Sequence, residues 1–280
     1  MISACTFMGC ESAHSEAGAV IFGAPFDSTS SFRAGSKFAC GAMRGASCAL
    51  ETYSPYQDRD LGDVAVFDAG DLELSPGNAA KALDAIHRFT GKVLYDGKVP
   101  CMIGGEHLVT LGAVRAAAER FPDLAVLHFD AHADLRDDYL GERLSHATVM
   151  RRVWELVGDG RVHQFGVRSG CREELQWGQG RVETHRYGFS GLEATVERLS
   201  GTPVYLTVDL DVLDPSVFPG TGTPEPGGVS FAELLDAVLA TAGLDVVGFD
   251  LCELSPPYDP GGNSAVTACK VLRELLLLHG

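Results

Sequence analysis

Eight short strand-like runs, most of them apolar, alternate with segments of helical spacing along the whole chain, and this alternation limits the folds open to it. An apolar run with few polar interruptions is typical of a strand buried on both faces. The predicted strands are residues 17–24, 64–69, 99–103, 124–129, 162–167, 181–184, 204–208 and 246–251, of which 181–184 is the weakest. The predicted helices are residues 41–53, 78–95, 108–120, 147–157, 230–242 and 264–278. We therefore predict an α/β fold, with a mostly parallel sheet covered on both faces and function carried by strand-end loops.

The composition favours one large domain. Of the 280 residues 45% are hydrophobic, and no linker or low-complexity tract interrupts the alternation. Single α/β domains of about 250 residues are ordinary, so we predict one domain over residues 1–280. The net charge of −16 argues against nucleic acid as a partner, because that backbone requires clustered Lys and Arg, and it suits divalent metals and cationic substrates.

Neither the N-terminus nor the cysteines indicate a secreted or membrane protein. Residues 1–14 lack the basic start and apolar stretch of a signal peptide, and no run of about 18 apolar residues follows. We predict a cytoplasmic protein without membrane contact. The eight cysteines include no CxxC pair, which favours buried free thiols over disulfides or a zinc site.

The segment Leu124 to Asp134, LAVLHFDAHAD, joins a buried strand to three side chains of the metal-ligand type. Its apolar half ends at Asp130, and His132 and Asp134 follow at every second position. Side chains two residues apart project to the same side of an extended segment, and they converge where the chain curls. Taken alone, this short motif also fits a solvated strand end with Asp134 as a helix cap.

Two further predicted strands end in the same chemistry. His107 follows strand 99–103, and Asp209 and Asp211 follow strand 204–208. Singly, each could be a helix-start histidine, a turn cap or an ion-pair partner. Together, six such groups in one crevice would repel one another without cations. They suit two divalent ions bridged by carboxylates and a water, and oxygen-rich ligands favour manganese over zinc or copper, with nickel and iron harder to exclude.

Longer motifs resemble the ureohydrolase family of arginases and agmatinases. The motifs are GGEH at 104–107, HFDAHADLRDDYLGERLSHATV at 128–149, TVDLDVLDPSVFPGTGTPEPGG at 207–228 and GFDLCELSP at 248–256. With SFRAGS at 31–36 and QFGVRSG at 164–170, the resemblance covers nearly the whole chain, and within the family it is to bacterial and archaeal agmatinases. It implies a three-layer α/β/α sandwich around an eight-stranded sheet, in a homo-oligomer of three or six subunits. Glu106 departs from the family's usual GGDH motif.

The resemblance also implies roles for individual residues. By it, two manganese ions per subunit are held by two terminal pairs and one bridging pair: His107 with Asp134, His132 with Asp211, and Asp130 with Asp209. His146 resembles the family's general acid/base, Glu253 the carboxylate that binds the guanidinium, and Thr223 a further substrate contact. Without the resemblance, His146 could be an exposed residue in a first helical turn, and Glu253 could pair with any surface arginine.

The reaction chemistry agrees with these roles. A guanidinium carbon is a poor electrophile, so the nucleophile must be stronger than water, and two metals supply hydroxide near neutral pH. A histidine can give the leaving amine its proton, and a carboxylate can hold the guanidinium through two parallel hydrogen bonds.

Agmatine is the predicted substrate, with guanidinobutyrate, guanidinopropionate and arginine as alternatives. Arginases bind the α-carboxylate through an Asn- and Ser-bearing loop, and the corresponding residues 135–144 contain no asparagine. A distal ammonium would be favoured by four nearby carboxylates, partly neutralised by Arg136 and Arg143: Asp137, Asp138, Glu142 and Glu225. These charges could also merely solvate a surface loop.

Two other classes of protein are possible. A single-metal amide hydrolase of the deacetylase type would need only one histidine and two carboxylates, which leaves the six-ligand set unexplained. A non-catalytic homologue would be expected to have lost ligands, and this chain has all six. The number of metal ions per chain separates the first class from a two-metal hydrolase.

Overall fold

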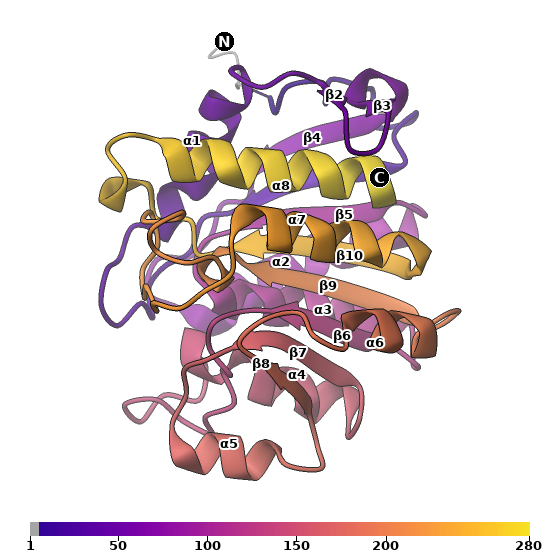
Figure 1. Cartoon of the computed structure of the whole chain (residues 1–280). Coiled ribbons are helices and arrows are strands. Elements are labelled where there is room, and N and C mark those ends of the chain that lie inside the picture. Colours follow the sequence, from indigo (N-terminus) through magenta and orange to yellow (C-terminus); the bar gives the residue numbers. More distant parts are fainter. Residues whose placement is uncertain (1–5) are drawn as a thin grey trace.

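Each of the eight predicted strands corresponds to a strand of one sheet in the computed structural model, which describes residues 6–280 (Figure 1). The strands of this sheet are β1 Ala19–Ala24, β4 Val66–Asp71, β5 Val99–Gly104, β6 Ala125–Phe129, β7 Val162–Val167, β8 Glu183–Arg186, β9 Pro203–Asp209 and β10 Asp245–Cys252. Their order is β4-β1-β5-β10-β9-β6-β7-β8, and every pairing is parallel. The predicted eight-stranded parallel sheet is confirmed.

Helices cover both faces of the sheet. They are α1 Ala39–Ser47, α2 Ala79–Tyr95, α3 Thr110–Arg120, α4 Val149–Val157, α5 Arg172–Gly178, α6 Leu192–Arg198, α7 Phe231–Ala240 and α8 Asn263–His279. One layer contains α1, α8, α7 and α6, each packed against the next, and the other contains α2, α3 and α4 (Figure 1). The three-layer α/β/α sandwich is therefore confirmed.

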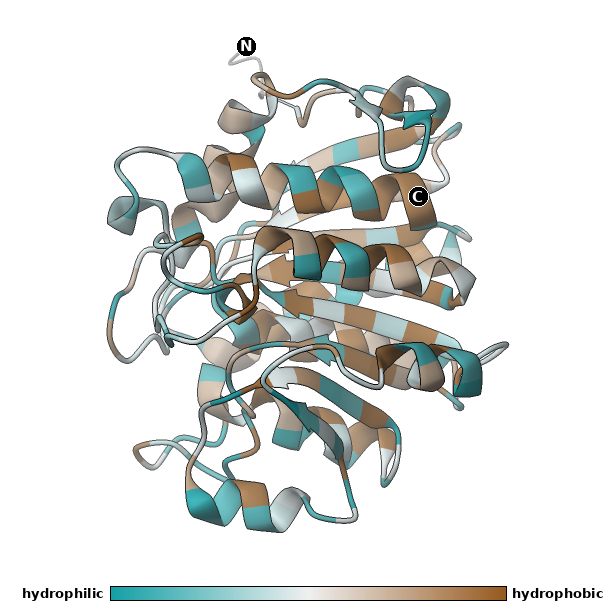
Figure 2. Ribbon diagram, viewed as in Figure 1, coloured by the Kyte–Doolittle hydropathy of each residue, from teal (hydrophilic) through white to brown (hydrophobic). Residues whose placement is uncertain are grey.

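Alternate residues of each central strand feed two separate cores. In β6, Ala125, Leu127 and Phe129 pack in the core beneath α7 and α8, whereas Val126 packs in the core beneath α2, α3 and α4. Figure 2 shows the matching pattern in α7 and α8, whose ribbons alternate between hydrophobic and hydrophilic residues. Full burial of such a side chain contributes about 1.5–3 kcal/mol, so the layers are held mainly by apolar contact.

The predicted helix 41–53 is wrong at its C-terminal end. Helix α1 stops at Ser47, and two short strands follow, β2 Tyr53–Ser54 and β3 Arg59–Asp60, paired antiparallel. Arg273 on α8 explains the difference, because its guanidinium donates hydrogen bonds to the carbonyls of Glu51 and Tyr53 and holds them out of a helix.

Two seven-residue helices, α5 and α6, were not predicted. Each is too short for helical periodicity to be distinguished from a loop. The weakest predicted strand, 181–184, lies two residues further on as β8, with Glu183 and Thr184 shared.

Free thiols were predicted, and every cysteine within residues 6–280 is free. Those buried are Cys10, Cys40, Cys101, Cys252 and Cys269, whereas Cys48 is exposed and Cys171 half-buried. Cys5 lies outside the described residues. Across the described part of the chain, none of the helices combines the length and the apolar composition that a bilayer crossing requires.

Candidate active site

The four central strands of the sheet, β5, β10, β9 and β6, end side by side. Ile103, Leu251, Val208 and Phe129 pair across them in a single row. Ligands bind outside this carboxyl edge in parallel α/β sheets. The predicted site residues lie at or just beyond the row: His107 after β5, Glu253 after β10, Asp209 and Asp211 at the end of β9, and Asp130, His132 and Asp134 after β6.

His107 is at the centre of one group of carboxylates. Its Nδ1 lies 3.0 Å from Oδ2 of Asp130, 3.1 Å from Oδ2 of Asp134 and 3.4 Å from Oδ2 of Asp209. All four side chains are buried. The structure thus brings together residues from three strands that are far apart in the sequence.

His132 forms a second group that shares one carboxylate with the first. Its Nδ1 lies 3.0 Å from Oδ2 of Asp211 and 3.5 Å from Oδ1 of Asp130. Asp130 therefore presents one oxygen to His107 and the other to His132. Asp209 faces His107 with Oδ2, while its Oδ1 accepts a hydrogen bond from the backbone N–H of Asp211.

The backbone bends sharply to bring these side chains together. Strand β6 stops at Phe129, and Asp134 has a left-handed φ of 52°, so the chain curls as the DxHxD spacing required. Glu253 is also left-handed, with φ 67°. Such conformations are uncommon for residues other than glycine and cluster at functional sites. Gly105 has a different constraint, since a Cβ there would lie 2.0 Å from the carbonyl oxygen of Phe26.

The buried carboxylates lack ordinary counter-ions. Within residues 6–280, the ion-pair partners of the Asp130, Asp134, Asp209 and Asp211 side chains are histidines. Burial, with the repulsion of Asp211 and Asp130, holds the pKa of Asp209 well above its usual range. Burial and the charge of Asp130 raise the pKa of Asp134 to about 7. So much buried negative charge is stable only beside cations.

This donor set fits metal ions. It offers carboxylate oxygens and two imidazole nitrogens, which suit divalent first-row metals. One group, Asp130, His132 and Asp211, has ligand atoms within 4.8 Å of one another, and Asp130 belongs also to the group around His107. Two groups that share a carboxylate are the arrangement of a binuclear centre.

A buried hydrogen-bond chain fixes which nitrogen of His107 is free to bind a metal. Thr207 Oγ1 donates its proton to Oδ1 of Asp250 at 2.6 Å, and Tyr205 donates to Oδ2 of Asp250 at 2.8 Å. The same Thr207 oxygen lies 3.0 Å from Nε2 of His107. A hydroxyl has one proton, so Thr207 accepts from Nε2–H, and the lone pair of Nδ1 points at the carboxylates.

His128 is a site residue that the sequence reasoning missed. Its Nε2 lies 2.7 Å from Oδ2 of Asp130. Gln164 donates from its amide nitrogen to the carbonyl of Ala133 and to Nδ1 of His128, at 2.7 and 2.9 Å. The proton of His128 is therefore on Nε2 and is donated to Asp130, so His128 orients that carboxylate. The available signal was position 128, two residues before Asp130 on the same face of the strand.

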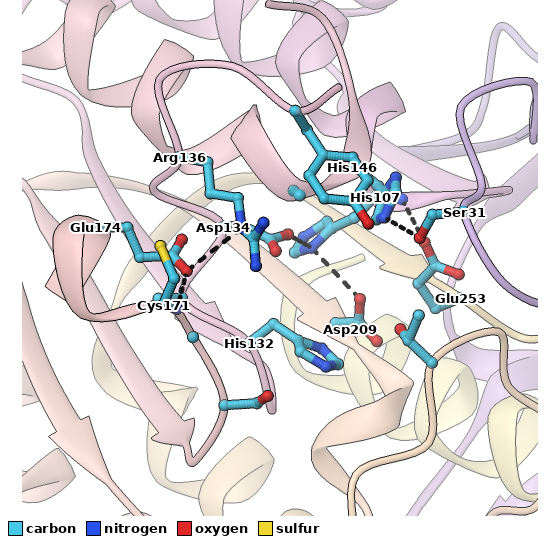
Figure 3. A pocket seen from close by; sticks show the side chains of 16 residues that line it. Ser31, His107, His132, Asp134, Arg136, His146, Cys171, Glu174, Asp209 and Glu253 are labelled. Carbon is cyan, nitrogen blue, oxygen red and sulfur yellow. Dashed lines mark hydrogen bonds and ion pairs between the residues drawn. The ribbon is translucent and has the colours of Figure 1, made fainter. Parts of the chain in front are cut away.

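A cavity of about 410 Å³ opens above the carboxylates. Figure 3 shows His146, Ser31 and Glu253 gathered on one side of it, with Arg136, Glu174 and Cys171 on the other side. Thr223 also lines the cavity, and its hydroxyl lies 3.3 Å from Oδ2 of Asp211. The three predicted residues without a metal-ligand assignment, His146, Glu253 and Thr223, thus face one space with the metal-ligand candidates.

His146 both begins a helix and faces the cavity. Ser145 caps the turn His146–Thr148, as expected for a simple helix start. The ring nevertheless lines the cavity, with Nε2 at 3.2 Å from the Ser31 hydroxyl. Burial lowers the pKa of His146 to about 4, so the imidazole is neutral at pH 7.

The electrostatic basis of the ammonium prediction is wrong in its details. None of the four carboxylates invoked for it, Asp137, Asp138, Glu142 and Glu225, lines the cavity. Asp137 instead accepts a hydrogen bond from Arg152 at 2.7 Å, and Asp138 from the backbone N–H of Gly141 at 3.1 Å. The loop 135–144 folds with its carboxylates outside the cavity, and the charged residue it supplies to the cavity wall is Arg136.

Comparison with known proteins supports one family. A sequence model described as the arginase family matches residues 17–278. An agmatinase from Bacillus anthracis is 48% identical over 94% of this chain and 92% of its own length. A crystal structure described as a putative agmatinase from Clostridium difficile is 48% identical, with a TM-score of 0.93 over 95% of this chain and 98% of its own. A guanidinobutyrase from Pseudomonas aeruginosa is 32% identical over 92% of this chain and 85% of its own length.

Proposed function

Because the chain belongs to the arginase family, we propose that it is an agmatinase, which hydrolyses agmatine to putrescine and urea. The observation that carries the proposal is the shared carboxylate Asp130, which faces both His107 and His132 at the floor of a cavity. A single-metal amide hydrolase has no use for this second group of ligands. The agmatinase relative at 48% identity supports the choice within the family.

The family resemblance assigns the metal ligands, and the contacts around His107 and His132 support it. His107 and Asp134 would hold one ion, His132 and Asp211 would hold the other, and both ions would share Asp130 and Asp209. The oxygen-rich set favours manganese. Two such ions would supply a hydroxide nucleophile near neutral pH.

The remaining site residues bind substrate and move protons. Glu253 is buried, and its Oε1 accepts the backbone N–H of His107 at 2.9 Å, which leaves lone pairs on both oxygens for a guanidinium. Thr223 lies beside Asp211 in the cavity wall and contacts the substrate there. His146, neutral at pH 7, accepts a proton at Nε2 and passes it to the leaving amine.

The distal ammonium of agmatine is bound by Glu174. This side chain is only 5% exposed and lines the cavity on the side opposite Glu253 (Figure 3). Backbone N–H groups of Leu135 and Cys171 hold both of its oxygens in place. A fixed carboxylate at each end of the cavity matches a dication with a charge at each end.

Guanidinobutyrate is the second candidate substrate, and Arg136 favours it. The guanidinium of Arg136 lines the same end of the cavity, with Nε at 3.6 Å from Oε1 of Glu174. A substrate carboxylate would pair with Arg136, whereas an ammonium pairs with Glu174. The guanidinobutyrase relative is less similar to this chain, at 32% identity, so agmatine is preferred.

A urea-release screen of the manganese-loaded enzyme tests the proposal. Agmatine, guanidinobutyrate, guanidinopropionate and arginine are compared by kcat/KM. We expect agmatine to exceed arginine by more than about tenfold, which corresponds to roughly 1.4 kcal/mol. Comparable or better turnover of guanidinobutyrate would replace agmatinase by guanidinobutyrase, with the metal chemistry unchanged.

Three properties stay predictions. A homo-oligomer of three or six subunits is checked by light scattering coupled to gel filtration, a single domain by limited proteolysis, and a cytoplasmic location by cell fractionation.

A further inference from the structure

Glu106 is a fully buried carboxylate that contacts neither the cavity nor the carboxylate cluster through a hydrogen bond. Its Oε1 accepts the hydroxyl proton of Thr29 at 2.6 Å, and both of its oxygens accept the Thr29 backbone N–H, at 3.1 and 3.0 Å. The Ser30 hydroxyl donates to Oε2 at 3.1 Å. Glu106 therefore fixes two consecutive residues of the loop that leads to Ser31 at the mouth of the cavity.

Thr29 connects Glu106 to His146. Its Oγ1 accepts the backbone N–H of His146 at 3.1 Å and lies 3.5 Å from Nδ1 of the same residue. The other ring nitrogen, Nε2, lies 3.2 Å from the Ser31 hydroxyl. Both nitrogens of His146 thus face residues of the loop that Glu106 holds.

The single proton of the Thr29 hydroxyl decides the protonation of the ring. That proton is donated to Glu106, so Thr29 Oγ1 can only accept from His146. The tautomer that satisfies this arrangement has its proton on Nδ1 and a free lone pair on Nε2. Proton transfer with the substrate then takes place at Nε2, on the cavity side.

We propose that Glu106 is a positioning residue which, through the Thr29 hydroxyl, fixes the tautomer and orientation of His146. The inference rests on the proposed role of His146 in the reaction. The arrangement is a base and an orienting carboxylate joined by one hydroxyl.

Substitutions of Thr29 test the connection without removing the buried carboxylate. Thr29→Val keeps the shape and the backbone N–H but loses the hydroxyl, and we expect kcat to fall roughly 100-fold, within the range of acid/base contributions. KM and metal content should stay close to those of the unchanged enzyme, because the hydroxyl touches no metal ligand. Tm should fall, because the buried Glu106 loses a hydrogen-bond donor. Thr29→Ser restores the hydroxyl and should keep kcat within about threefold.

Ser30→Ala is the matched control. It also removes one hydroxyl bond to Glu106, but Ser30 has no hydrogen bond to His146, so kcat should stay within about threefold. Equal losses in Thr29→Val and Ser30→Ala would mean that Glu106 only stiffens the loop, and the proposal would be overturned.

A double-mutant cycle separates this inference from the proposed function. In a His146→Ala background, Thr29→Val should lower kcat no further, since it acts through the missing ring. A further loss there would overturn the inference. Low turnover in His146→Ala with full turnover in Thr29→Val would overturn the inference alone, and full turnover in His146→Ala would overturn both.

Discussion

The backbone N–H of His107 donates a hydrogen bond to Oε1 of Glu253 over 2.9 Å, although the two residues lie 146 positions apart in the chain. They follow the adjacent strands β5 and β10. One bond thus sets the spacing between a proposed metal ligand and the proposed guanidinium carboxylate. Attack on the guanidinium carbon requires that spacing, because small errors in the position of reacting groups lower rates strongly.

Replacing a bridging carboxylate should remove metal and activity together. In Asp130→Asn or Asp209→Asn, both metal sites would lose a carboxylate that they share. We expect most bound metal and most urea release to disappear. Metal per chain is measured by mass spectrometry beside the rate. Asp123→Asn, an exposed carboxylate 3.0 Å from Arg161, is the control. A bridging variant that kept two ions and normal turnover would refute the assignment.

His146→Ala should separate catalysis from metal binding. The residue contacts the loop that contains Thr29 and Ser31, and it has no hydrogen bond to a proposed ligand. We therefore expect kcat to fall by about 10²–10⁴-fold with two ions still bound. Loss of metal in this variant would instead make His146 a ligand.

The charged pair at the distal end of the cavity should set substrate choice in opposite directions. Glu174→Gln removes the proposed partner of the ammonium, so KM for agmatine should rise about tenfold, as for the loss of one hydrogen bond to a charged group. Arg136→Gln removes the competing cation, and KM for agmatine should fall. Asp138→Asn, outside the cavity, should change neither value. Steady-state kinetics decide, and equal effects of all three variants would exclude the assignment.

The hydrogen bonds that join Asp250, Thr207 and His107 should control metal affinity. Thr207→Val leaves Nε2 of His107 without an acceptor, so the ring loses its fixed tautomer, and we expect metal to bind about 10- to 100-fold more weakly. The affinity is obtained by titration with a chelator, in which the loss of bound manganese is measured. Thr110→Val is the control, because the Thr110 hydroxyl lies 3.4 Å from that of Thr207 and has no hydrogen bond to the His107 ring. Equal affinities in the two variants would show that the Thr207 hydroxyl does not act on the ligand.

The strands and metal-ligand candidates could be predicted because their signals are local. For β7 Val162–Val167, both bounds were predicted from the sequence, although His163 and Gln164 interrupt its apolar residues. The ligand motifs follow directly after such runs, and parallel strands end at one edge.

Features that depend on distant contacts could not be predicted. The end of α1 is set by Arg273, more than 200 residues later in the chain. The direction of the loop carboxylates was also beyond the sequence, since Asp137 turns away to reach Arg152 on α4. The role of Glu106 depends on the folded position of Thr29, and no spacing along the chain indicates it.

The order of the central strands has a consequence for synthesis on the ribosome. Strands β9 and β10 are made late, yet they lie between β5 and β6 (Figure 1). A nascent chain that has emerged only to β8 holds the β5 and β6 edges with nothing to join them, and such open edges are prone to wrong pairing. His107 and Asp130 meet only after residues 203–252 have inserted. A metal site that needs both residues would therefore form only in nearly complete chains.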